Sequence, residues 1–329
     1  MEKPQIGLLL PTRELAISGV WDIAPLLDFA QEAEAIGYDS LWIGDSLLAR
    51  PRLDSLVVLA SVAAVTKRIV LGMACLIPVL RNPVIGASLV TSLDQAISNR
   101  FELAVGSGFP IPAVMAEFAA AQVPFDTRVG RCDDTVRLWR QAWRSREPGA
   151  DTTFRGRYWQ VTGLDRLVPA ATPAGPRIWY AGSDTAKVVK RVAELYDGWL
   201  PFLPSSVAYE KAWQRIQKLL SINGRPVDAV VPGMYATIAV HKDRNRARDE
   251  LSEYVQAYYG YPLEITSTVQ AFGYGPVEEC VDFLAGYVRA GARNLVIRIG
   301  SLRPTMSLQG LLEALRELLP DCEESCPMH

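Results

Sequence analysis

Polar side chains follow one of the apolar segments of this chain, at a place where they could do chemistry. The sequence Gly-Asp-Ser ends in Asp45 and Ser46, and Asp54 follows a few residues later. A carboxylate there can orient a substrate or exchange a proton, and a hydroxyl can hydrogen-bond an oxygen atom. A loop aspartate that only accepts hydrogen bonds from nearby backbone N–H groups is an equally common arrangement. We take Asp45, Ser46 and Asp54 as catalytic candidates, with this structural role as the alternative.

Two glycine-containing turns are candidates for holding a flat ring or a phosphate. In the sequence VGSGFP, residues 106–108 form a loop with little side-chain bulk, on which a ring or pyrophosphate can lie. In WYAGSDTAKVV, a strand pattern runs through Gly182 and Ser183 into a helix, whose first backbone N–H groups suit a phosphate. Plain capping of that helix by Ser183 or Asp184 is the alternative. The sequence contains no G-x-G-x-x-G dinucleotide fingerprint after its first strand.

Histidine and cysteine offer little to a catalytic site. The two histidines are His241 and His329, so a Ser-His-Asp triad or a histidine-ligated metal has few residues to use. The five cysteines are an odd, scattered set, which argues against a disulfide framework. Cys322 and Cys326 lie near His329 in the tail, but their spacing is not C-x2-C and a fourth ligand is missing. We expect no metal, and glycine turns with few catalytic groups indicate that a bound cofactor carries the reaction.

The elements that must position these residues are short apolar strands alternating with amphipathic helices, which is typical of parallel α/β architecture. Nearly continuous apolar strands indicate a sheet buried on both faces, and eight of them favour a closed (β/α)8 TIM barrel. We expect one domain over residues 1–320 and a tail over 321–329, because no linker separates two halves. The expected strands are 5–11, 40–44, 68–77, 101–108, 177–183, 197–201, 231–240 and 294–300. The expected helices include 21–36, 53–66, 83–97, 131–143, 244–258 and 277–290.

Two insertions interrupt this alternation, one after the fourth strand (109–176) and one after the seventh (241–293). The second insertion contains a set of aromatic residues: Tyr258, Tyr259, Tyr261, Phe272 and Tyr274. They can line a pocket for a flat or apolar substrate, but packing within the insertion also explains them and is the favoured interpretation for most of them. Active sites of such barrels form at the C-terminal ends of the strands. The candidate residues above therefore belong to one mouth.

The composition excludes several other classes of protein. Hydrophobic residues make up 49% of the chain and charged residues 21%, and the net charge of -2 lacks the basic excess of a nucleic-acid binder. The sequence contains no apolar run of the roughly 18 residues that cross a bilayer. The first residues, MEKPQIGLLLPTRE, lack the pattern of a signal peptide. We expect a cytoplasmic enzyme that binds neither nucleic acid nor membrane.

Six ordered blocks between about residues 5 and 300 resemble the bacterial luciferase-like superfamily of flavin-dependent monooxygenases and F420-dependent oxidoreductases. The blocks are IGLLLP, FAQEAEAIGYDSLWIGD, TKRIVLGMACLIPVLRNPVIGA, NRFELAVGSG with PFDTRVGRCDDTVRLWRQAW, PRIWYAGSDTAKVVKRVAELYDGWLP, and GPVEECVDFLAGYVRAGARNLVIRIG. The resemblance implies a barrel with the cofactor ring across its mouth, a homodimer, and a bulged cis peptide without proline near residues 74–76.

The resemblance also assigns cofactor contacts to positions of this chain. The residues implied for the ring are Ala74, Cys75, Gly106, Ser107 and Gly108, and those implied for the phosphate are Gly182, Ser183 and Arg128. Many members carry a histidine at the place of Ser46. Serine does not titrate near neutral pH, so Asp45, Asp54 or a tyrosine must move any proton.

The resemblance implies two reactions. The favoured one is a monooxygenase in which reduced FMN, supplied by a separate flavin reductase, and O2 oxidise a small organic substrate. The alternative is an F420-dependent oxidoreductase that transfers a hydride to or from a C=O, C=N or C=C bond. A flavin-binding barrel without catalysis is a third interpretation, because folds change function readily.

Overall fold

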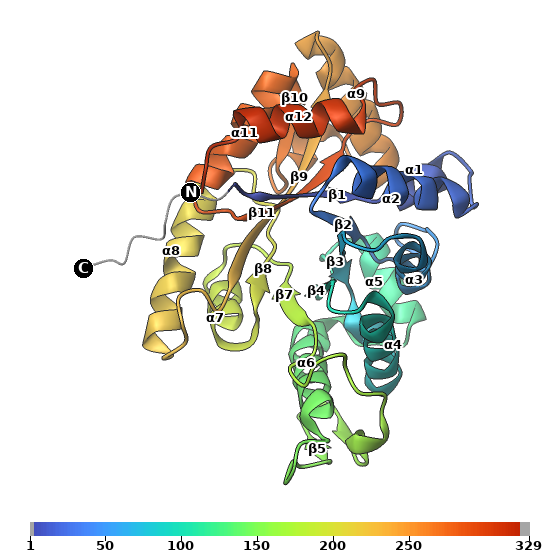
Figure 1. Cartoon of the computed structure of the whole chain (residues 1–329), viewed down its shortest axis with the longest axis vertical. Coiled ribbons are helices and arrows are strands. Elements are labelled where there is room, and N and C mark those ends of the chain that lie inside the picture. Colours follow the sequence, from blue (N-terminus) through green and yellow to red (C-terminus); the bar gives the residue numbers. More distant parts are fainter. Residues whose placement is uncertain (1–2, 323–329) are drawn as a thin grey trace.

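The computed structural model describes residues 3–322 and shows eight parallel strands closed into a barrel and covered by helices (Figure 1). Around the barrel the strands are β1 (Gln5–Leu9), β2 (Ser40–Ile43), β3 (Val70–Leu76), β4 (Phe101–Val105), β7 (Arg177–Tyr180), β8 (Gly198–Trp199), β9 (Val231–Val240) and β11 (Asn294–Ile299). β8 pairs with β9, and β11 pairs with β1, so the ring of strands is complete. The (β/α)8 TIM barrel predicted from the sequence is confirmed.

The helices lie outside this barrel and fill both insertions (Figure 1). They are α1 (Thr12–Ile17), α2 (Ala24–Ile36), α3 (Ser55–Val65), α4 (Pro83–Ile97), α5 (Pro112–Ala120), α6 (Arg128–Arg144), α7 (Ala186–Leu195), α8 (Ser206–Ile222), α9 (Arg244–Tyr259), α10 (Leu263–Thr266), α11 (Val277–Arg289) and α12 (Leu308–Leu318). A hairpin of β5 (Phe154–Arg155) and β6 (Gln160–Val161) completes the first insertion. None of these described helices is long and apolar enough to cross a membrane.

A ninth parallel strand, which the sequence did not predict, belongs to the second insertion. β10 (Phe272–Gly275) pairs with residues 237–240 of β9, whereas β8 pairs with residues 231–232 of the same strand. β9 is therefore long enough to serve two successive partners. This arrangement holds the second insertion beside the C-terminal end of the barrel.

Tryptophan rings fill the barrel interior because glycines on neighbouring strands leave room for them. Trp42 on β2 and Trp179 on β7 are fully buried, and their ring centroids lie 5.5 Å apart. A Cβ on Gly72 would overlap the Trp42 ring, and one on Gly198 or Gly233 would overlap the Trp179 ring. These rings close the middle of the barrel, so a ligand must bind beyond them, toward the C-terminal ends of the strands.

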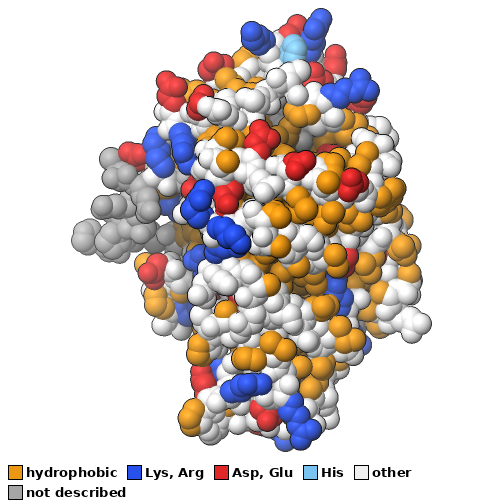
Figure 2. Space-filling model, turned by 45° about the vertical axis from the view of Figure 1, so that its right-hand side comes forward, with side chains coloured by type: hydrophobic (Ala, Val, Ile, Leu, Met, Phe, Trp, Pro, Cys, Tyr) orange, Lys and Arg blue, Asp and Glu red, His pale blue; other side chains and the backbone are white. Residues whose placement is uncertain are grey.

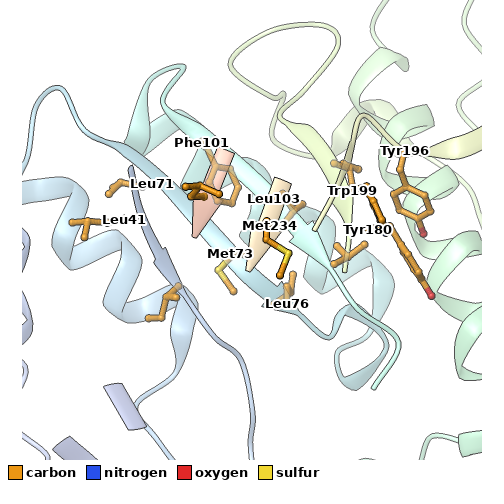
Figure 3. Close-up of a cluster of buried hydrophobic side chains, with 14 of the residues drawn as sticks. Leu41, Leu71, Met73, Leu76, Phe101, Leu103, Tyr180, Tyr196, Trp199 and Met234 are labelled. Atoms are coloured by element: carbon orange, nitrogen blue, oxygen red, sulfur yellow. The ribbon is translucent and has the colours of Figure 1, made fainter. Parts of the chain in front are cut away.

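A second apolar layer lies between the barrel and the helices, because alternate side chains of each strand point outward. Figure 3 shows part of it, with Met73 of β3 beside Leu103 of β4, its partner in the strand register. The buried residues of this layer run through all eight barrel strands and most helices. Packing on both faces makes the barrel a firm support for the loops at its ends.

Candidate active site at the strand ends

Asp45, at the end of β2, holds the bulged end of β3. Its backbone N–H donates to the Cys75 carbonyl at 3.3 Å, and its Oδ2 accepts from the Ile77 N–H at 3.1 Å. Immediately before these contacts the Ala74–Cys75 peptide is cis, and the pairing of β3 with β4 shifts its register between Met73 and Leu76. The cis peptide that the resemblance implied is confirmed. Asp45 therefore fixes the segment assigned to the cofactor ring.

The carboxylates of Asp45 and Asp54 share one arginine. Arg81 donates to both oxygens of Asp45, at 2.7 and 3.0 Å, and to Asp54 at 3.0 Å. Each Asp45 oxygen accepts a second bond, from the Ser55 hydroxyl or the Ile77 N–H. Burial lowers the pKa of Arg81, but its hydrogen bonds and charge interactions with the two aspartates raise the pKa above its usual value. Such saturated contacts suit positioning, and a catalytic role for Asp45 stays a prediction.

Asp54 and Ser46 are also tied into local structure. Asp54 caps α3 by accepting from the N–H groups of residues 56 and 57. Ser46 is buried, donates its hydroxyl proton to Glu117 at 3.0 Å and accepts from the Arg50 N–H at 2.9 Å. Glu117, on α5, additionally accepts from the N–H groups of residues 47–49. Sequence reasoning missed Glu117, although a single acid in the apolar helix VMAEFAA was the available signal.

The glycine loop after β4 packs against the bulge of β3. A Cβ on Gly106 would lie 2.5 Å from the Cys75 Sγ, so this close approach requires glycine. Gly108 has a φ of +83°, in the left-handed region, and a Cβ there would lie 2.8 Å from the Phe118 ring. Burial, followed by the charge of Asp45, raises the pKa of the Cys75 thiol to about 12. The structure thus brings the ring-binding candidates of β3 and β4 together. The neutral Cys75 thiol lies beside the backbone of the glycine loop.

Arg128 lies at the start of α6, beside this loop. Its Nε donates to the Gly108 carbonyl at 3.3 Å, and its Nη1 donates to the Phe125 carbonyl at 3.0 Å. Its guanidinium stacks 3.7 Å from the centre of the Phe125 ring. Arg128 is therefore held next to Gly108, where an anionic group on the loop would meet its charge.

The end of β7 lies next to the glycine loop. The Tyr180 and Ser107 hydroxyls are 3.3 Å apart, and a Cβ on Gly182 would lie 2.6 Å from the Tyr180 ring. Capping of α7 by Ser183 or Asp184 was the alternative to phosphate binding, and it is wrong. The N-cap residue is Thr185, without a side-chain cap hydrogen bond, because α7 begins later than the sequence pattern indicated. The half-buried Ser183 therefore stays available as a phosphate contact.

A basic groove lies between α6 and α7, and the guanidinium of its Arg191 lies 5.7 Å from the centre of the Tyr180 ring. It has a volume of about 330 Å³ and is lined by Asp133, Arg137, Lys187, Lys190, Arg191, Glu194 and Leu195. Arg191 pairs with Asp133 at 2.8 Å, and Lys190 pairs with Glu194. Arg137 and Lys187 form no ion pair among the described residues, so the groove carries an excess of positive charge.

Charged side chains that sequence reasoning did not single out occupy the opposite half of the mouth. We call them the arginine–tyrosine cluster, which consists of Arg13, Glu14, Arg52, Tyr235, Tyr254, Tyr258, Tyr259 and Arg298. Two of its tyrosines belong to the aromatic set of the second insertion. The available signal was the arginine near the end of the apolar strand NLVIRIG.

Barrels with a glycine-lined mouth beyond a filled interior form a class of enzymes that bind their cofactors at the strand ends. The luciferase-like monooxygenase family model matches residues 5–294. The chain therefore belongs to the luciferase-like monooxygenase family.

Curated relatives of this chain include F420-dependent enzymes. An F420-dependent glucose-6-phosphate dehydrogenase of Kineococcus radiotolerans is 32% identical over 53% of this chain and 51% of its own length. This chain thus spans about half the length of that relative.

Solved structures show the same barrel. An F420-dependent secondary alcohol dehydrogenase, in complex with an F420–acetone adduct, has a TM-score of 0.76 and 16% identity, over 98% of this chain and 100% of its own. A monooxygenase from Streptomyces bottropensis has a TM-score of 0.76 and 18% identity, over 97% of this chain and 98% of its own. At these identities the likeness concerns the fold alone.

Proposed function

We propose that this protein is an oxidoreductase that uses F420 and transfers a hydride between the deazaflavin and a small organic substrate. The residues that would hold the ring are those of the β3 bulge and the β4 loop, Ala74, Cys75 and Gly106 to Gly108. Gly182, Ser183 and Arg128 would hold the phosphate. The close glycine contacts fit a flat group lying on backbone, because any side chain at Gly106 or Gly182 would collide with its neighbour.

The observation that carries this proposal is the basic groove between α6 and α7. FMN ends at its phosphate, whereas F420 continues from the phosphate into a chain of glutamate residues. Arg137 and Lys187 lie in the groove without ion-pair partners among the described residues and would meet those carboxylates. The F420-dependent relative from Kineococcus radiotolerans supports the same choice.

The sequence favoured a monooxygenase reaction. In it, a separate flavin reductase supplies reduced FMN, which reacts with O2. In that reaction the Ser46 hydroxyl and backbone N–H groups were the candidate donors to bound oxygen. The Ser46 hydroxyl donates to Glu117 instead. This contact favours hydride transfer, which needs no oxygen donor.

When bound, F420 supplies or accepts the hydride, so the protein has to bind and orient the substrate and move a proton. We propose Tyr258 as the proton donor and acceptor. Burial raises the pKa of its hydroxyl, but the charges of Arg52 and Arg298 outweigh burial and lower the pKa below its usual value. Arg52 donates to the Tyr258 oxygen at 3.2 Å and leaves the hydroxyl proton to a further acceptor.

Binding of F420 can be compared with binding of its riboflavin-like fragment, which has the ring but neither phosphate nor glutamates. We expect the double substitution Arg137→Gln and Lys187→Gln to weaken F420 binding about 5-fold, at ~0.5 kcal/mol per exposed charge pair. Binding of the fragment should not change. Lys218→Gln, an exposed lysine on α8, is the matched control. Equal affinities of wild type and the double variant for F420 would contradict the role of the groove.

A homodimer is proposed from exposed apolar side chains on two neighbouring helices. Val57 on α3 and Ile85 on α4 are 63% and 59% exposed. Figure 2 shows hydrophobic side chains between charged ones on the face turned forward from the right-hand side of Figure 1. Light scattering should give the mass of a dimer for wild type and a smaller mass for Ile85→Glu, and a monomeric wild type would contradict the proposal.

A further inference from the structure

Buried polar atoms without partners gather at the ends of β1 and β11, which are adjacent strands. Of the ten such side-chain atoms among the described residues, four lie here: Thr12 Oγ1, Arg13 Nε, Glu14 Oε2 and Arg298 Nη2. Buried polar groups in folded proteins almost always have hydrogen-bond partners. A group of exceptions in one mouth indicates the place of a missing ligand.

Arg298 is the centre of this group. It is 2% exposed and points into the barrel from β11, where its Nε donates to the Thr237 hydroxyl at 3.0 Å. Its guanidinium lies 4.4 Å from the ring centre of Tyr258 and 5.1 Å from that of Tyr259. Ring faces stabilise a cation but leave its in-plane N–H groups free. The Nη2 group therefore remains a buried charged donor without an acceptor.

Positive charge around Arg298 exceeds negative charge. Arg52 donates to the Tyr258 hydroxyl, Arg50 stacks over Tyr259 at 4.7 Å, and Arg13 lies beside Arg52. The carboxylate that faces these arginines is Glu14, which accepts from the Tyr254 hydroxyl.

Glu14 offsets part of the charge on these four arginines. An excess of positive charge remains around Arg298, which is buried, while Arg13, Arg50 and Arg52 are half-buried. Uncompensated buried charge is costly, so an anion that binds there gains a strong charge-assisted contact.

The position of the cluster separates it from the cofactor residues. The barrel order is β1, β2, β3, β4, β7, β8, β9 and β11, so β1 and β11 lie diametrically opposite β7 and β4. The residues proposed for the cofactor phosphate follow β4 and β7. An anion at Arg298 therefore belongs to the substrate, with the cofactor ring between the two charged regions.

We propose that the arginine–tyrosine cluster binds an anionic oxygen group of the substrate, a carboxylate or a phosphate, through Arg298 and Arg52. The rings of Tyr258 and Tyr259 would flank the organic part attached to this group. The inference rests on the proposed function, because it assigns the substrate class of the same mouth.

The test uses the full chain, with and without F420, and three probes: benzoate, inorganic phosphate and the uncharged benzamide. Calorimetric titration of wild type should show saturable binding of benzoate or phosphate but not of benzamide. Arg298→Gln should weaken that binding about 10- to 100-fold, the range for hydrogen bonds to a charged group. F420 affinity should stay within 2-fold. Arg52→Gln is a second variant that tests the site if Arg298→Gln does not fold.

Arg128→Gln is the matched control in the opposite half of the mouth. It should weaken F420 and leave the anion probe unchanged. Failure of both anions to bind better than benzamide would overturn the inference. It would also be overturned if Arg298→Gln weakened F420 instead of the anion, since the cluster would then serve the cofactor. Failure of F420 to bind wild type contradicts the proposed function instead, and the anion titration without F420 separates the two results.

Discussion

Asp45→Asn tests whether the carboxylate at the end of β2 holds the cofactor-binding bulge in place. The Asp45 side chain is 2% exposed and accepts two hydrogen bonds from Arg81, one from Ser55 and one from Ile77. Asparagine keeps the size but removes the charge. Its NH2 group must face the Arg81 guanidinium in either orientation, together with the Ser55 hydroxyl or the Ile77 N–H.

The expected loss of stability follows from these contacts. Removing one partner of a buried ion pair costs about 3–5 kcal/mol. Arg81 keeps Asp54 as a second partner at 3.0 Å, so we expect the lower end, ~3 kcal/mol in the free energy of unfolding. Because the N–H and carboxylate of Asp45 hold the backbone at Cys75 and Ile77, the segment proposed to contact the cofactor ring should shift, and cofactor affinity should fall as well.

Urea unfolding measures the first effect and spectroscopic titration the second. Asp228→Asn, at an exposed aspartate before β9, is the matched control and should stay within about 0.5 kcal/mol of wild type. In a double-mutant cycle, Asp45→Asn with Arg81→Met should cost less than the sum of the single variants. An Asp45→Asn variant as stable as wild type would refute the ion pair. An equally stable variant that binds cofactor but has lost turnover would make Asp45 catalytic instead.

Three further substitutions or conditions give measurable outcomes. Gly108→Val should abolish cofactor binding, because its φ of +83° and the contact with Phe118 exclude a branched side chain. Unchanged affinity would show that the cofactor ring does not lie on this loop. Glu117→Gln should lower the unfolding free energy by about 1–3 kcal/mol, since four hydrogen bonds lose their charged acceptor. Burial raises the pKa of Cys280 to about 12 and that of Cys132 above its usual value. The folded state keeps these thiols protonated at pH values at which the unfolded chain loses the protons. The free energy of unfolding should therefore fall above about pH 9, by roughly 1.4 kcal/mol per pH unit for each thiol. Urea midpoints at pH 8 and pH 10.5 measure this slope, which Cys280→Ala should reduce.

The barrel was predictable because its strands are apolar on both faces. Helix 83–97 was placed correctly at both ends, since the Asn82 side chain caps it and Pro83 begins it. β10 was missed because FGYG contains two glycines and lacks a strand-like apolar run. α8, from Ser206 to Ile222, was missed although the Ser205 side chain caps it.

The candidate site was predictable only where glycine or a family block marked it. Gly106 belongs to a glycine turn and Cys75 to a family block, and the structure places these two residues in contact. The ion pair of Asp45 with Arg81 and the Glu117 contacts depend on which side chains meet across the barrel mouth, and spacing along the chain does not encode that. Arg298 was missed because the pattern of an apolar strand does not show whether a single arginine near its end is buried. In the structure Arg298 is buried.

The most direct test is an anaerobic titration of the purified protein with F420 and, in parallel, with reduced FMN, followed by absorbance and fluorescence. We predict saturable one-to-one binding of F420, tighter than binding of FMN and lost in Gly108→Val. Binding of FMN in preference to F420 would contradict the proposed cofactor and favour the monooxygenase reaction. Binding of neither would contradict a cofactor site at the ends of β3, β4 and β7.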